Sequence, residues 1–165
     1  MHWVKKGVIY NTDGRFDWSL THAQVPKSNL INPETLRIYF GTRDAFQRTR
    51  TSYVDVNPEN PKDILYICDH PILELGRAGT FDESGVMPSS IIDHQGKKFL
   101  FYTGWNTDKS VPYRLSIGLA ISYDKGETFE KASEGPILDR STSEPISLCM
   151  PFVLIKDNKW MMWYS

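Results

Sequence analysis

Residues able to do acid–base chemistry or to bind a polyol occur before a repeated proline and at the end of each aromatic-rich segment that follows it. Two carboxyl groups, one protonated and one ionised, can cleave a glycosidic bond, and an indole face can stack on a sugar ring. The candidate catalytic residues are Asp82, Glu144 and Asp44. The candidate substrate-binding residues are His22, Gln24, Arg43, Glu83, Trp105 and Asn106. Asp17 is a further carboxylate whose place the pattern does not predict.

The prolines belong to an internal repeat. Pro26, Pro88 and Pro151 lie 62 and 63 residues apart, near the start of VPKSNLINPETLRIYFGTRD, MPSSIIDHQGKKFLFYTGWN and MPFVLIKDNKWMMWYS. Each copy predicts a strand that begins just after the proline, where a missing N–H does least damage, then a polar turn and a second strand. The first two copies continue with TSYVDV and LSIGLAISYD and close with DHPIL and EGPIL. Four up-and-down strands per repeat are typical of a propeller blade.

The whole chain has an all-β pattern, because short apolar runs alternate with turn residues and helical periodicity is almost absent. A closed propeller has about 4 to 8 blades, whereas a chain of 165 residues with this repeat holds about 2.5. We predict one partial propeller domain over residues 1–165. Its parts are a strand at 3–10, blade 1 at about 20–75, blade 2 at about 82–140 and an incomplete blade 3 at about 145–165. Either further residues or a second copy in a homodimer would complete the ring, with strand 3–10 and the open third blade at the junction.

Composition narrows the function classes. The 19 basic and 20 acidic residues are well mixed, so neither a nucleic-acid footprint nor a polybasic membrane patch is expected. Cys68 and Cys149 fit no disulfide framework and no metal-ligand set, which favours a cytoplasmic location and predicts no metal or cofactor. We expect no export signal and no membrane span, because the first residues lack an apolar core and no long apolar run follows.

Several segments together resemble a known family. THAQVP, LRIYFGTRD, GTFDESGVMPSSII, FLFYTGWN, IGLAISYDKGETF, GPILDR and CMPFVL are similar to the N-terminal half of five-bladed propeller glycosidase-like proteins, related to arabinanases, invertases, levansucrases and mannoside phosphorylases. A subgroup with this spacing resembles proteins encoded among bacterial surface-polysaccharide genes. The resemblance implies a carbohydrate ligand, with Asp82 as transition-state stabiliser and Glu144 as general acid. THAQVP departs from the hydrolase pattern, because His22 and Gln24 stand where those enzymes carry an aspartate; Asp44 or His22 would then supply the base.

Each candidate also has a structural interpretation. His22 could be a hydrogen-bonded tether, Arg43 and Asp44 could form a salt bridge that braces blade 1, and Asp82 with Glu83 could cap a turn before Gly85. Glu144 could be a solvated loop carboxylate, and Trp105 could pack between blades.

Three functions therefore stay open: a glycan-cleaving enzyme, a sugar-binding module without catalysis, or a fragment that is inactive alone. If the protein is an enzyme, we expect Asp82 and Glu144 to face each other across the opening of the central channel that the propeller blades surround. Carboxylates tied up in salt bridges would argue against it.

Overall fold

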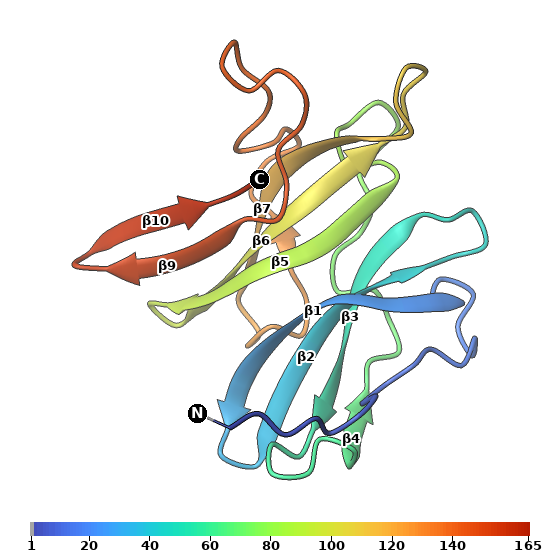
Figure 1. Cartoon of the computed structure of the whole chain (residues 1–165), viewed down its shortest axis with the longest axis vertical. Coiled ribbons are helices and arrows are strands. Elements are labelled where there is room, and N and C mark those ends of the chain that lie inside the picture. Colours follow the sequence, from blue (N-terminus) through green and yellow to red (C-terminus); the bar gives the residue numbers. More distant parts are fainter. Residues whose placement is uncertain (1) are drawn as a thin grey trace.

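The first blade is a four-stranded antiparallel meander in the computed structural model, which describes residues 2–165 (Figure 1). Its strands are β1 (Thr21–Asn32), β2 (Thr35–Arg43), β3 (Thr49–Val56) and β4 (Ile64–Ile67). β2 and β3 pair without interruption from Arg43–Thr49 to Leu36–Val56. Their buried aromatic and β-branched side chains explain why this pair forms the middle of the blade.

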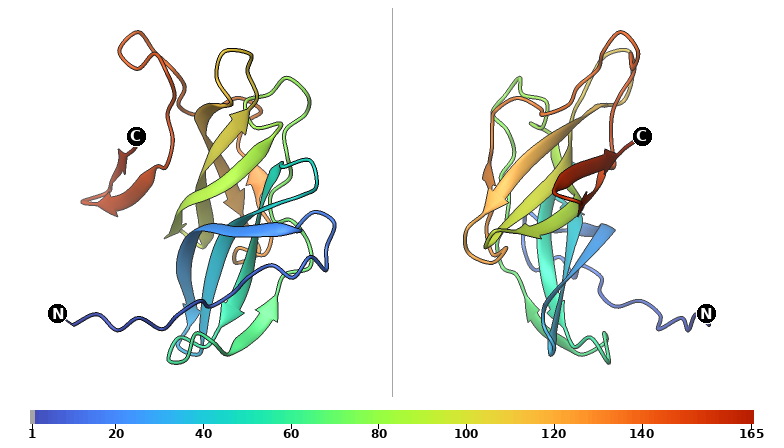
Figure 2. Two further views of the ribbon diagram at one scale, coloured as in Figure 1. Left: turned by 45° about the vertical axis from the view of Figure 1, so that its right-hand side comes forward. Right: turned by 90° about the vertical axis from the view of Figure 1, so that its left-hand side faces the viewer.

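The second blade repeats this order, and the third repeat contributes a hairpin. Blade 2 consists of β5 (Gly85–His94), β6 (Lys97–Asn106), β7 (Arg114–Ser122) and the short β8 (Glu130–Lys131). The hairpin consists of β9 (Phe152–Lys156) and β10 (Lys159–Trp163), which form a separate two-stranded sheet. The chain is thus all-β, and its sheets do not close into a ring within the described residues (Figure 2). This confirms the prediction of a partial propeller.

Blades 1 and 2 meet through a shared core. The only backbone pairing between their strands in the described chain is one parallel bridge between Thr49 and Gly85. Thr51 Oγ1 also donates to the carbonyl of Val86 at 2.9 Å. The side chains buried between the blades are Tyr39, Tyr53, Cys68, Ile72, Leu73, Val86, Leu100, Tyr102, Ala120 and Phe129. Burial of this apolar surface holds the two blades together.

The loop between β7 and β8 joins the blades by polar contacts. The carbonyl of Gly126 accepts hydrogen bonds from Arg37 Nη1 and from the Tyr39 hydroxyl, both at 3.1 Å. Arg37 also forms a buried ion pair with Asp55 at 2.7 Å. Asp124 fixes the loop by accepting from the backbone N–H groups of residues 127 and 128. The loop of blade 2 therefore braces the middle strands of blade 1.

Two of the repeat prolines differ from the prediction. β1 and β5 begin before Pro26 and Pro88, so these prolines do not open their strands. The register shifts between Gln24 and Lys27, and again between Pro88 and Ser90. A bulge lets a strand contain a residue without an N–H, so each proline sits at a break in the ladder. Only Pro151 directly precedes its strand, β9.

The closing segments of the first two repeats are also simpler than predicted. DHPIL and EGPIL form no strand, and each contributes one bridge, Leu73 to Thr51 and Leu138 to Ile117. The fourth strands are β4 and β8, which lie earlier in each repeat.

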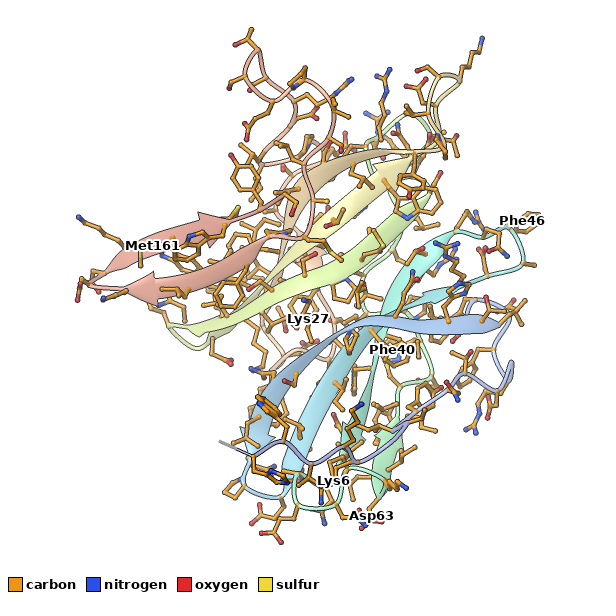
Figure 3. The ribbon with its side chains drawn as sticks, in the orientation of Figure 1. Lys6, Lys27, Phe40, Phe46, Asp63 and Met161 are labelled. Atoms are coloured by element: carbon orange, nitrogen blue, oxygen red, sulfur yellow. The ribbon has the colours of Figure 1, made fainter. Side chains whose placement is uncertain are left out.

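The structure corrects the prediction of a strand at residues 3–10, because the described residues before Thr21 contain no strand. Trp3, Val4 and Val8 are exposed, and only Ile9 and Tyr10 pack against blade 1, where Tyr10 contacts Phe40. A β-strand needs a neighbour that accepts and donates its backbone hydrogen bonds, and the described chain offers none here. Figure 3 shows this segment, labelled at Lys6, crossing blade 1 near Phe40.

The β9–β10 hairpin docks on blade 2 by side chains. Ser90 Oγ accepts from the Val153 N–H at 3.1 Å, and the Trp160 ring packs against His94 and Phe99. Phe152 and Trp163 stay exposed on the hairpin. The described chain has no helix that is long and apolar enough to cross a membrane.

Candidate functional site

All three repeats contribute to one cavity of about 470 Å³. We call it the three-repeat cavity. Its lining residues are Gln24, Val25, Arg43, Phe46, Gln47, Met87, Trp105, Thr107, Pro112, Tyr113, Leu115, Cys149 and Met150. Three of the predicted substrate-binding residues, Gln24, Arg43 and Trp105, therefore lie together. Phe46, at the turn between β2 and β3, marks its outer side (Figure 3).

Equivalent positions of the repeats face this cavity. Val25, Met87 and Met150 each directly precede a repeat proline, and all three line the wall. Arg43 is the last residue of β2 and Trp105 the second-last residue of β6, and the two are 62 residues apart. Because equivalent positions in a propeller surround one axis, the cavity occupies the place where the inner strands converge.

The backbone is strained beside two of the prolines. Val25 has φ 47° and Met150 has φ 52°. A positive φ is uncommon for any residue other than glycine, and it is rarest for a residue with a β-branched side chain. Strain of this kind often occurs at ligand sites, where the surrounding structure maintains it.

Two polar atoms at the cavity lack partners. Gln24 Nε2 and Arg43 Nε are buried and make no hydrogen bond within the part of the chain that the structure describes. Gln24 packs its Cγ against Gly41, the residue that pairs with it on β2. Buried donors are nearly always satisfied in folded proteins, so two unpaired donors at one cavity indicate that something else pairs with them.

Trp105 supplies the apolar wall. A side chain at Gly85 would overlap the indole ring, so this glycine makes the space that the ring fills. Tyr113 meets the indole edge-on, with the ring centroids 6.1 Å apart. The indole of Trp105 is partly exposed. It can therefore pack on blade 2 and still present a surface to a ligand.

Asp82 lies in a different environment. It is 1% exposed and accepts hydrogen bonds from the Tyr102 hydroxyl at 2.9 Å and from Thr80 Oγ1 at 3.0 Å. Its carboxylate also pairs with Lys131 Nζ at 2.6 Å. Burial, and then the charge and hydrogen bond of Asp82, raise the pKa of Tyr102. These contacts favour a packing role for Asp82, and its assignment as transition-state stabiliser stays a prediction.

Asp44 is held by arginines, although Arg43 is not one of them. Its Oδ2 contacts Arg48 Nε at 2.8 Å and Arg50 Nη1 at 2.7 Å. Its Oδ1 accepts from the backbone N–H groups of Phe46 and Arg48. Burial acts to raise the pKa of Asp44, but the hydrogen bonds from Arg50 and Arg48 outweigh it and lower the pKa. Asp44 thus braces the turn between β2 and β3, and its catalytic role likewise stays a prediction.

Glu144 lies on the loop before β9, partly exposed. Its backbone forms a reciprocal pair with Ser141 at 3.1 and 3.2 Å. A hydrogen bond from Tyr164 to Glu144, then burial, raise the pKa of Tyr164. Glu144 therefore lies close enough to Tyr164 to affect the pKa of that hydroxyl. Asp82 and Asp44 line two separate cavities, and neither of these includes Glu144.

The other predicted residues divide between turns and strand ends. Glu83 accepts from the Gly79 N–H at 2.6 Å, as a turn-capping role requires. His22 is exposed, has φ 67° and contacts the Thr21 hydroxyl at 2.8 Å. Asn106 ends β6 opposite Arg114. None of these three residues lines the three-repeat cavity. The described residues contain no group of three or more His, Cys, Asp or Glu that could hold a metal ion.

Sequence reasoning missed several cavity residues. Met87 and Met150 adjoin the repeat prolines, and the repeat alone could have identified them as equivalent to Val25. Gln47 and Tyr113 lie on connecting segments whose paths no periodicity predicts.

Comparison with known proteins gives relatives in sequence and in structure. No family model matches the chain. Two Mycobacterium tuberculosis proteins, uncharacterized proteins MT1551 and Rv1502, are each 38% identical over 165 residues. The match covers 100% of this chain and 55% of each of those proteins. The chain therefore spans about half the length of these curated relatives.

Three solved structures share the fold. The match to Zg3597, a family 117 glycoside hydrolase of Zobellia galactanivorans, covers 93% of this chain and 45% of the Zg3597 chain, with a TM-score of 0.62 and 17% sequence identity. A further glycoside hydrolase matches 91% of this chain and 52% of its own, with TM-score 0.67 and 15% identity. Sucrose-6-phosphate hydrolase of Lactobacillus gasseri matches 90% of this chain and 30% of its own, with TM-score 0.64 and 16% identity. The chain thus has, over nearly all its length, the partial β-propeller fold that is found in these glycoside hydrolases.

Proposed function

We propose that this chain forms the sugar-binding side of a channel in a glycoside hydrolase-like propeller, with the three-repeat cavity as its binding surface. One observation carries the proposal. Two unpaired buried donors, Gln24 Nε2 and Arg43 Nε, share a cavity with the indole of Trp105. Sugar sites commonly combine an aromatic face with a few donors that pair with hydroxyl oxygens.

The ring needs further blades. Because the relatives are longer than this chain, either additional residues or a second copy would supply them. A homodimer is the form we propose for the chain by itself, with the edges of β9–β10 at the junction. Light scattering at several concentrations tests this, because a stable mass of two chains supports it and a monomer at all concentrations contradicts it.

Binding is tested by titrating the chain with a panel of neutral oligosaccharides, using isothermal calorimetry. Trp105→Ala removes the stacking surface, and we expect affinity to fall roughly tenfold or more, because aromatic contacts of this kind contribute about 1–3 kcal/mol. Trp3→Ala is the matched control, because Trp3 is 85% exposed, lies outside β9–β10 and does not line the cavity. Equal losses in both variants, or no loss in either, would argue against the cavity as the site.

Catalysis is the second candidate, favoured by the half-buried Glu144 and its contact with Tyr164. Glu144→Gln keeps the size of the side chain and removes its acidity. If Glu144 is a general acid, this variant binds a glycan as the wild type does but no longer cleaves it. Unchanged cleavage would exclude that role, and unchanged binding with no cleavage in either protein would support a binding module.

A further inference from the structure

The three-repeat cavity contains a cation that the rest of the site does not neutralise. Arg43 lines the cavity, and its Nε is buried without a hydrogen-bond partner. No carboxylate is among the cavity's lining residues. Within residues 2–165, Arg43 also forms no ion pair.

The nearest carboxylate in sequence is already occupied. Asp44 is buried and bound by Arg48 and Arg50, so its single negative charge faces two guanidinium groups. On the cavity's other side, Asp108, next to the lining residue Thr107, pairs with Arg114. Asp17 lines the neighbouring cavity with Asp44, Arg48 and Arg50. Together with Arg43 and Arg114, these arginines number four and face three aspartates, so one positive charge remains.

A guanidinium in a partly buried site is strongly selective for anionic oxygen. Its N–H groups match the spacing of carboxylate or phosphate oxygens, and hydrogen bonds between charged groups are about twice as strong as neutral ones. A neutral hydroxyl pairs with such a donor but leaves the charge uncompensated. The other lining groups, the amides of Gln24 and Gln47 and the ring of Trp105, suit the neutral part of a sugar.

We propose that the three-repeat cavity binds an acidic sugar, one whose carboxylate or phosphate is held by Arg43 while its ring stacks on Trp105. This deepens the proposed function and rests on it. The shared chemistry is an anionic oxygen group on a hexose, and the sugar can carry it as a uronic acid or as a phosphate ester.

The test uses matched probes. Glucose, galactose and mannose are each titrated in three forms, neutral, uronic acid and 6-phosphate, at constant ionic strength with ligand-observed NMR. We expect at least one acidic form to bind roughly tenfold or more tightly than its neutral counterpart. Preference for the uronic acid or for the phosphate identifies the anionic group. The preference should shrink as salt is raised, because a partly exposed charge pair is screened.

Variants assign the preference to its residue. Arg43→Gln should abolish the difference between acidic and neutral forms, whereas Arg43→Lys should keep part of it because the charge remains. Arg77→Gln is the matched control, because Arg77 is an exposed arginine outside this cavity, paired with Glu134. Its preference should equal that of the wild type.

The outcomes separate the two proposals. If neutral and acidic forms bind equally, or if Arg43→Gln keeps the acidic preference, the inference is wrong while the sugar site stands. If no form of any sugar binds, the proposed function and the inference fail together. Should Arg43→Gln not fold, the Arg43→Lys variant and the salt dependence of the wild type still decide the question.

Discussion

The interface between blades 1 and 2 and the three-repeat cavity use similar residues in opposite ways. Beside the core that the blades share, Asp82 pairs with Lys131 and Tyr102 within blade 2, and Arg37 pairs with Asp55 within blade 1. At the cavity, Gln24 and Arg43 each keep a buried donor that has no partner among residues 2–165. Buried polar groups stabilise a fold only when they are paired, so paired groups indicate packing, and unpaired donors that line a cavity indicate a ligand site. The hydroxyls of Thr49 and Ser52, also unpaired in the described chain, line no part of this cavity. Changes at the interface should therefore reduce stability, whereas changes at the cavity should reduce binding.

The largest expected effect is on the interface side of this comparison. Asp82→Ala leaves Lys131 and the Tyr102 hydroxyl unpaired, and we expect the free energy of unfolding to fall by about 3 kcal/mol. Urea denaturation followed by circular dichroism measures it. Glu144→Ala is the control, with an expected change within about 0.5 kcal/mol, because Glu144 lies on a partly exposed loop. A stable Asp82→Ala variant that has lost glycan cleavage would instead support a catalytic Asp82.

Gly85 joins the two regions, because it starts β5 and gives space to the cavity residue Trp105. In Gly85→Ala the new methyl group would overlap the indole, so the ring must move. We expect a stability loss of about 1–3 kcal/mol together with the binding loss of Trp105→Ala. Gly135→Ala is a matched control, because nothing lies within 4 Å of its added Cβ. Normal sugar binding in Gly85→Ala would show that the position of the indole does not matter.

Gln24→Leu should not lower the stability of the protein, in contrast to Asp82→Ala and Gly85→Ala. It removes a buried amide that has no partner, so we expect the protein to be unchanged or up to about 1 kcal/mol more stable, while glycan affinity falls. Thermal unfolding and calorimetric titration of the same sample measure both quantities. A clear loss of stability would mean that Gln24 has a structural partner. Arg43 Nε would then be the only unpaired donor among the described residues that supports the cavity as a binding site.

The smallest effect concerns pH. Burial acts to raise the pKa of Asp124, but hydrogen bonds from Ser122 and Thr128 outweigh it and lower the pKa to about 2. The pKa of Asp44 is lowered as well, by Arg50 and Arg48. A lowered pKa in the folded state adds stability above the ordinary value near 4, and this is lost as the pH falls toward 2. Unfolding curves at pH 5 and pH 3 should show the decrease, and Asp124→Asn should reduce it; an unchanged slope in that variant would contradict the assignment.

Much of the fold could be predicted from local pattern. The three hairpins follow from turns such as His94-Gln95-Gly96, whose residues Gln95 and Gly96 have positive φ, and from the alternation that flanks them. The strand predicted at residues 3–10 failed for the opposite reason. Its apolar residues resemble a strand, but strand formation requires a neighbouring chain that local pattern does not supply.

The site was predictable only in part. Gln24 was predicted from its place before the repeat proline, and Arg43 and Trp105 from the ends of the second strands; all three line one cavity, and their binding of sugar stays a prediction. The carboxylates could not be assigned from type alone. A buried Asp82 looks the same in a sequence whether it faces a channel or a lysine 49 positions later, and only the pairing of β8 with β7 brings Lys131 to it.

The sequence by itself determined that this is a β-protein of repeated blades, because strand period, turn residues and the proline repeat are all local properties of the chain. The tertiary structure decided which polar groups are free to act. Pairing depends on which side chains the turns and strand pairings bring together, and this left Asp44 and Asp82 occupied while Gln24 Nε2 and Arg43 Nε remained unpaired within the described chain.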